Sequence, residues 1–169
     1  MDILIDKRTR TRQILPLLTI SNIGEVIKSV PAVPMEKPLT EWTIEEFDEA
    51  LTSPETILMK MALKNRKALV FLGRVRDFYD SLEGFKQFTQ KFEIKQSAEE
   101  KQAANGVPFP SFGNSMLTTV IEFYHLHSVE EASKMQVREW MLAFQHNAST
   151  AMFNKRYSDI TTKKAKARK

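Results

Sequence analysis

SPETILMKMALKNRKALVFLGRVRDFYDSL, residues 53–82, is the stretch that decides the fold class. Ser53 is a residue type that caps helices, and Pro54 suits the first helical position because its missing N–H is not needed there. The apolar residues that follow recur mostly at steps of three and four, with Asn65 as the polar break: Ile57, Met61, Ala68, Leu72, Val75, Tyr79 and Leu82. This spacing predicts one long amphipathic core helix, with a kink or close packing at Gly73.

Four other segments show helical periodicity or helix-start signals. Thr43 and Glu46 form a capping box ahead of a short helix, and Ser128 and Glu131 form a second one. The expected helices lie after Thr43, from Phe85 after a break at Glu83-Gly84, from Ser115 to about His127, and from Val129 or Gln136 to Tyr157. Residues 107–114, VPFPSFGN, are interpreted as a loop. These segments predict an all-α fold, a helical bundle of about five helices.

The first 38 residues lack a helical period. Each of their four prolines removes a backbone donor and disfavours helix just before it: Pro16, Pro31, Pro34 and Pro38. Two interpretations stay open, a β-hairpin around residues 21–24 or an extended arm that becomes ordered against a partner. Because residues 1–38 are more apolar than a disordered tail, we expect them to bury themselves on a neighbouring subunit.

Composition narrows the class of protein. A chain of 169 residues fits one domain and buries about two-thirds of its unfolded surface. The absence of Cys excludes disulfides and a thiol nucleophile, and it is typical of a reducing compartment. No apolar run approaches the roughly 18 residues of a membrane span, and the N-terminus lacks the order of a secretory signal. The predicted organisation is an N-terminal arm and linker over residues 1–38, a helical domain over 39–160 and a basic tail over 161–169.

Patterns for catalysis or metal binding are weak. Glu122 and His125 form an E-x-x-H pair, but di-iron bundles need a second such pair, and a catalytic metal usually needs three protein ligands. The acidic cluster of Glu45, Glu46, Asp48 and Glu49 could bind a cation, but it is interpreted as the solvated face of a short helix. There is no phosphate loop, dinucleotide turn or nucleophile elbow. We predict no catalytic residue, no metal site and no cofactor, and so a protein that is not an enzyme.

Positive charge gathers at both ends of the chain. In an extended arm the alternating cations Arg8, Arg10 and Arg12 would lie on one side, able to contact phosphates or an acidic protein groove. A second group could act as a helix extension or a loose tail: Lys163, Lys164, Lys166, Arg168 and Lys169. The plainer interpretation of both groups is a pair of solvated tails. The expected apolar contacts with a protein partner come from the arm and the loop: Leu17, Leu18, Phe109 and Phe112.

Residues 129–157, VEEASKMQVREWMLAFQHNASTAMFNKRY, resemble small accessory proteins of tailed bacteriophages. A short acidic capped helix leads into a V-x-E-W helix, then an Asn/Ala-rich stretch and a charged end. Such helices occur in tail assembly chaperones and in head–tail connector or ring proteins. The resemblance implies an oligomeric virion component or assembly factor, located in the host cytoplasm or the virion. It covers less than a fifth of the chain, and no functional residue is carried over from it.

Two functional hypotheses follow. The first is a non-enzymatic protein that works by protein–protein contact with other copies or neighbouring virion subunits. The alternative is a small nucleic-acid-binding accessory protein that uses its basic termini. Salt separates them, because binding to phosphates weakens steeply as the salt concentration rises.

Overall fold

The computed structural model describes residues 5–92, 102, 105, 107 and 111–166. Apart from two isolated antiparallel bridges these residues contain no β-structure, so the all-α class is confirmed. They form eight α-helices, where the sequence predicts about five, and two short 3-10 helices: α1 (Thr11–Ile14), η1 (Leu15–Leu17), α2 (Ile20–Lys28), η2 (Leu39–Glu41), α3 (Ile44–Thr52), α4 (Pro54–Lys64), α5 (Ala68–Gln90), α7 (Phe112–Tyr124), α8 (Val129–Ser133) and α9 (Val137–Lys166).

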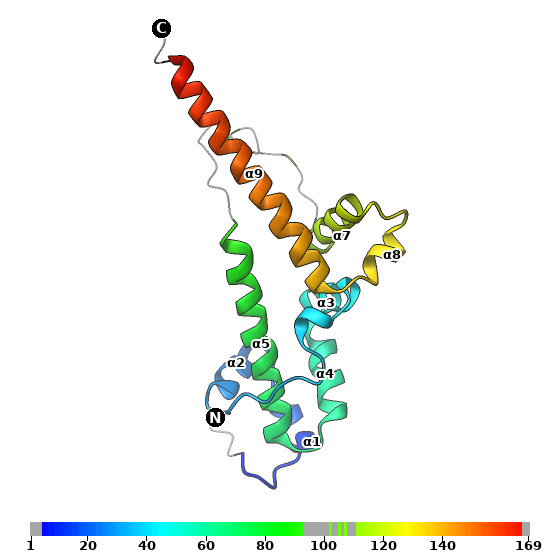
Figure 1. Cartoon of the computed structure of the whole chain (residues 1–169). Coiled ribbons are helices and arrows are strands. Elements are labelled where there is room, and N and C mark those ends of the chain that lie inside the picture. Colours follow the sequence, from blue (N-terminus) through cyan, green and yellow to red (C-terminus); the bar gives the residue numbers. More distant parts are fainter. Residues whose placement is uncertain (1–4, 93–101, 103–104, 106, 108–110, 167–169) are drawn as a thin grey trace.

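Two long helices, α5 and α9, extend along an elongated molecule (Figure 1). Helices α1, α2 and α4 pack around the first half of α5 at one end. Helices α3 and α7 pack against the beginning of α9, and α8 lies beside α3 and α7. The C-terminal half of α9 extends beyond the other described helices and ends far from α1.

The single helix predicted over residues 53–82 is wrong, because α4 ends at Lys64 and α5 begins at Ala68. Asn65 is buried at the break, and its Nδ2 donates to the Met61 carbonyl over 2.7 Å. A side chain that competes for the backbone of the preceding turn favours the end of a helix. The apolar face of this stretch is correct on both sides of the break.

The three residues after α4 pair with the N-terminal segment instead of continuing the helix. Thr11 N donates to the Arg66 carbonyl and Ala68 N donates to the Thr9 carbonyl, each over 3.0 Å. The Thr11 hydroxyl donates to the Asn65 carbonyl. These bonds satisfy backbone groups that a helix end leaves without partners.

Helix α5 continues without a break through Gly84, so the interruption predicted at Glu83-Gly84 is also wrong. A glycine inside a helix costs only about 1 kcal/mol. Burial of Phe85 in the core offsets that cost.

The prediction that residues 1–38 form an extended arm or a hairpin is wrong for the described part. Pro16 lies in the first turn of η1, where its missing N–H is not required, and α2 begins directly after Thr19. The apolar side chains of this region join α4 and α5 in a buried cluster, here called the lower core: Ile14, Ile23, Ile27, Val30, Leu58, Ala62, Ala68, Phe71, Leu72 and Val75. Residues 14–30 therefore bury themselves on their own domain.

The proline-rich segment after α2 crosses α5 at Gly73. Val33 N donates to the Gly73 carbonyl over 3.0 Å, and Met35 N donates to Asp77 Oδ2 over 2.9 Å. A Cβ at Gly73 would lie 2.5 Å from Val33 Cγ2 and 2.8 Å from the Pro31 carbonyl oxygen. The close packing predicted at Gly73 is confirmed.

A second buried cluster, the upper core, joins α3, the second half of α5, α7 and the start of α9. It is rich in aromatic rings: Phe85 lies 4.8 Å from Phe47 and 5.2 Å from Trp140 between ring centroids. Helix α7 begins at Phe112, earlier than predicted, because Ser111 caps it through the Asn114 N–H. Its buried residues complete the cluster.

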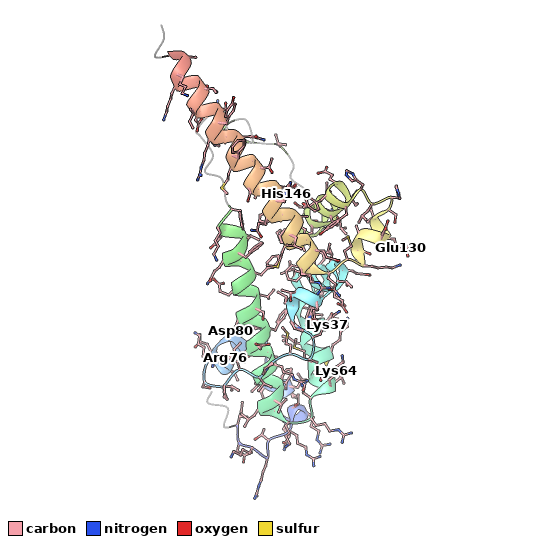
Figure 2. The ribbon with its side chains drawn as sticks, viewed as in Figure 1. Lys37, Lys64, Arg76, Asp80, Glu130 and His146 are labelled. Carbon is pink, nitrogen blue, oxygen red and sulfur yellow. The ribbon has the colours of Figure 1, made fainter. Side chains whose placement is uncertain are left out.

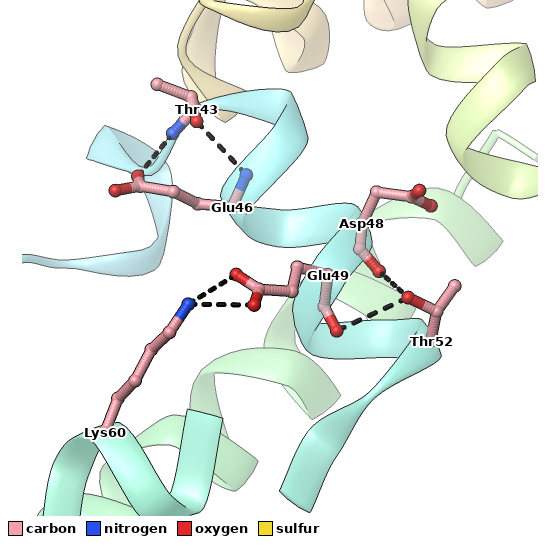
Figure 3. Close-up of polar contacts among 6 residues, drawn as sticks. All are labelled: Thr43, Glu46, Asp48, Glu49, Thr52 and Lys60. Atoms are coloured by element: carbon pink, nitrogen blue, oxygen red, sulfur yellow. Dashed lines mark hydrogen bonds and ion pairs between the residues drawn. The ribbon is translucent and has the colours of Figure 1, made fainter. Parts of the chain in front are cut away.

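A second backbone bridge, between Thr43 and Gln136, sets the starts of α3 and α9. Ile44 N donates to the Met135 carbonyl and Val137 N to the Trp42 carbonyl, each over 2.8 Å. The predicted Thr43–Glu46 capping box is confirmed (Figure 3). Helix α9 continues to Lys166, so residues 161–166 of the predicted tail are helical.

Gly73 provides a test of the crossing segment. We expect Gly73→Ala to destabilise the fold by about 1–3 kcal/mol, because its methyl group meets backbone as well as a side chain. Gly84→Ala is the matched control, since nothing lies within 4 Å of its Cβ position. That change should stabilise α5 by about 1 kcal/mol. Urea unfolding of the three proteins measures both effects, and equal effects would contradict the packing at Gly73.

Ile27 tests whether the N-terminal helices belong to the core. Ile27→Ala should cost about 2–5 kcal/mol, as expected for a buried aliphatic side chain. Leu17→Ala, at a side chain that is 44% exposed, should cost about 1 kcal/mol or less. If thermal melts show that Ile27→Ala is as mild as the control, residues 14–30 do not pack on α5 in solution.

Candidate interaction surfaces

Helix α9 has apolar side chains on two opposite faces. One face packs into the upper core through Val137 and Trp140. The other holds three residues spaced i, i+4 and i+7, here called the outer stripe: Phe153 (66% exposed), Tyr157 (62%) and Ile160 (52%). The rings of Phe153 and Tyr157 stack with centroids 6.2 Å apart. The sequence analysis identified only the face that contains Val137 and Trp140. The second face could have been recognised because Phe153, Tyr157 and Ile160 lie about half a helical turn away from the first.

Positive charge borders the outer stripe. Arg156, Lys163 and Lys164 are exposed, and Asp159 is the sole acidic residue in the sequence from 151 to 166. Lys164 follows Ile160 by four residues, so it lies on the same helix face. Of the other predicted tail cations, Lys166 ends α9, and Arg168 and Lys169 lie outside the described residues.

The predicted cations of the N-terminal segment lie exposed at the other end of the molecule: Arg8, Arg10 and Arg12. The bridge between Arg10 and Lys67 brings three further exposed cations beside them: Lys64, Arg66 and Lys67. Figure 2 shows Lys64 beside α4, toward this end of the molecule, where it also lines the cleft described below. Sequence reasoning missed the second group, whose signal was the run KNRK at the polar break of the long helix.

The four predicted apolar contacts have different surroundings. Leu17 is partly exposed on η1, and Leu18 packs against the lower core. Phe112 is 43% exposed at the start of α7, where it makes edge-on contacts with Phe85 and Trp140. Phe109 lies outside the described residues. Their role in binding a partner stays a prediction.

A cleft of about 210 Å³ lies among the crossing segment, α3, α4 and α5, with Trp42, Ile57 and Met61 among its apolar lining. Three ion pairs surround it: Lys37–Glu46 at 2.6 Å, Lys60–Glu49 at 2.7 Å and Arg74–Glu36 at 2.6 Å. Figure 3 shows Lys60 reaching both carboxylate oxygens of Glu49. Each carboxylate that lines the cleft is paired with a cation, and these ion pairs link the neighbouring elements.

The residues of the E-x-x-H pair lie at the C-terminal end of α7. His125 ends α7 in a left-handed conformation with φ 55°, and both His125 and Glu122 are exposed. Within the described ranges, no three His, Asp or Glu side chains are grouped so that they could hold a metal ion. None of the described helices is long and apolar enough to cross a membrane.

Comparison with known proteins gives no relative of this chain. No family model matches it, and no curated protein or solved structure matches it either.

Glu46 makes the ion pairs of the cleft testable by pH. Burial raises its pKa, but hydrogen bonds from Lys37 and from the Thr43 N–H, with the charges of Lys37 and Lys60, together hold the pKa below its ordinary 4.5. A carboxyl with a lowered pKa stabilises the fold above the unfolded-state value and loses that effect as the pH falls.

We therefore expect Glu46→Gln to lower stability at pH 7 by about 1 kcal/mol or less, because the pair is half exposed. Urea unfolding should show this difference shrinking steadily below about pH 4.5. Glu45→Gln, at an exposed neighbour with no ion pair among the described residues, is the control. If the stability difference between the wild-type protein and Glu46→Gln persists unchanged to pH 2.5, the effect comes from the introduced amide and not from the lost charge of Glu46.

Proposed function

We propose that this chain is a non-enzymatic protein–protein interaction protein that docks through the C-terminal half of α9. The observation that supports this most directly is the outer stripe, whose three large apolar side chains are each more than half exposed. A helix that lays such a stripe in an apolar groove of a partner, with anchors at i, i+4 and i+7, follows a common mode of recognition.

Burial of the outer stripe supplies a favourable free energy of binding. A side chain of this size contributes about 1.5–3 kcal/mol when fully buried. The start of α9 is fixed in the upper core by Val137 and Trp140, so the helix is ordered before the partner arrives. Binding of a pre-ordered helix loses less conformational entropy than binding of a disordered segment.

The charges beside the stripe indicate the chemistry of the partner. Arg156, Lys163 and Lys164 border it, and Asp159 is the single acidic residue in the sequence from 151 to 166. Two outer stripes placed face to face would bring these cations together, and like charges across an interface are unfavourable. We therefore expect a protein groove with an apolar floor and carboxylates at its rim.

A virion component or assembly factor is our proposal for the biological setting. It is supported by the resemblance of residues 129–157 to accessory proteins of tailed phages, and by a helix that extends beyond the body of the molecule. The partners would then be neighbouring virion subunits or other copies of this chain, in the host cytoplasm or the virion. Co-purification of the chain with its particle from its native context tests this setting.

The outer stripe itself is tested by a triple variant, Phe153→Ser with Tyr157→Ser and Ile160→Ser. The control is Met59→Ser with Leu63→Ser, which removes exposed apolar side chains from α4. A photo-crosslinking residue at position 157 identifies the partner, whose affinity is then measured with purified proteins. We expect at least about 30-fold weaker binding for the triple variant, because it removes three anchors, and little change for the control.

The crosslinked peptide decides the outcome. Crosslinks to a carboxylate-rimmed groove, in another protein or in a second copy, support the proposal. Crosslinks between two outer stripes would replace it by symmetric pairing of α9. If no partner is crosslinked and the triple variant associates like the wild-type protein, the outer stripe is not a docking surface.

A further inference from the structure

Six exposed cations from two distant segments lie together at the end of the molecule opposite the tip of α9. They are here called the basic end: Arg8, Arg10, Arg12, Lys64, Arg66 and Lys67. The two segments are held side by side by the backbone bonds of Thr9 and Thr11, which form the Arg10–Lys67 bridge. The grouping is therefore a property of the fold and not of a loose tail.

No acidic side chain of the described residues pairs with these cations, although Lys64 lines the cleft together with Glu46 and Glu49. None of the six takes part in an ion pair among the described residues. Within residues 5–13 and 64–68, Asp6 is the sole acidic residue. Its Oδ1 already accepts hydrogen bonds from the N–H groups of Arg8 and Thr9 and from the Thr9 hydroxyl, at 2.7–2.8 Å.

Helix α5 adds to the positive potential at the same place. It begins at Ala68, directly after Lys67, with no side-chain cap and no acidic residue in its first turn. The N-terminus of a helix of 23 residues has a partial positive charge from its aligned peptide dipoles. Side-chain charge and helix dipole thus act in the same direction.

We propose that the basic end binds the phosphodiester backbone of a nucleic acid, independently of base sequence. Three of the six cations come from one segment and three from the other, and a nucleic acid offers an unbroken row of charges that can engage both segments at once. Four of the six are arginines, whose planar guanidinium groups match phosphate oxygens in pairs. This surface is separate from the outer stripe, so either proposal can fail without the other.

The test uses the full chain and a fluorescently labelled DNA duplex of 20 base pairs of random sequence, with anisotropy measured from 50 to 200 mM salt. We expect log affinity to fall linearly with log salt, as it does for phosphate contacts. The variant Arg8→Gln with Arg66→Gln and Lys67→Gln should weaken binding at least tenfold. Loss of three phosphate contacts should reduce the salt slope by about 2.7, since each contact contributes about 0.9.

The matched control removes the same charge from the end of α9, by Lys163→Gln with Lys164→Gln and Lys166→Gln. It should bind nearly as the wild-type protein does. A second basic-end variant, Arg8→Gln with Arg12→Gln and Lys64→Gln, repeats the test if circular dichroism shows that the first is unfolded. Single-stranded DNA and RNA of equal length identify the preferred nucleic acid.

Three results would overturn the proposal. The first is the absence of salt-dependent binding at 50 mM salt. The second is equal weakening by the basic-end variants and the control, which would attribute binding to net charge alone. The third is equally tight binding of poly-glutamate with the same number of charges, which would assign the basic end to an acidic protein.

Discussion

The backbone pairing of Thr9 and Thr11 with residues 65–68 is the constraint on which the rest of the fold depends. It takes up the backbone groups left free where α4 ends, and so allows α5 to start in a new direction. It also anchors the N-terminal segment, which places Ile14 and the α2 side chains over the apolar face of α5. Without this pairing the N-terminal side chains would not be held against the lower core, and the two cationic segments would not lie side by side.

The same device recurs in the upper half of the molecule. The bridge between Thr43 and Gln136 fixes the start of α9, as the bridge between Arg10 and Lys67 fixes the start of α5. Each long helix is thus set at its N-terminus by a few strong backbone bonds and then held by an apolar cluster. Beyond its contacts with that cluster, α9 extends past the other described helices (Figure 1). Its distal half consequently presents apolar side chains that the core does not use.

The sequence correctly predicted the structural features that depend on interactions between residues close together in the chain. The all-α class, the buried face through Leu72 and Val75, the Thr43–Glu46 capping box and the close approach at Gly73 all follow from spacing and residue type. The polar side chain of Asn65 is a local signal for the break, but the bonds of Thr9 and Thr11 that complete it could not be predicted, because these residues lie more than fifty positions earlier. The four prolines led to the wrong prediction that residues 1–38 contain no helix. Pro16 lies in the first turn of η1, where proline is tolerated, and the later prolines follow the end of α2. The sequence predicted the grouping of Arg8, Arg10 and Arg12 in the basic end. The other three cations of the basic end lie far away in the sequence, and only the fold brings them beside this group.

The two candidate surfaces differ in chemistry as well as in place. The basic end is mainly charged and attracts by long-range forces that salt screens within about 8–10 Å. The outer stripe is mainly apolar and acts only on contact, with little dependence on salt. Because α5 and α9 hold these surfaces at opposite ends of the molecule, the two proposed partners would bind far from each other (Figure 1). A protein built this way would link a nucleic acid to a protein assembly, and salt would release the first contact while leaving the second in place.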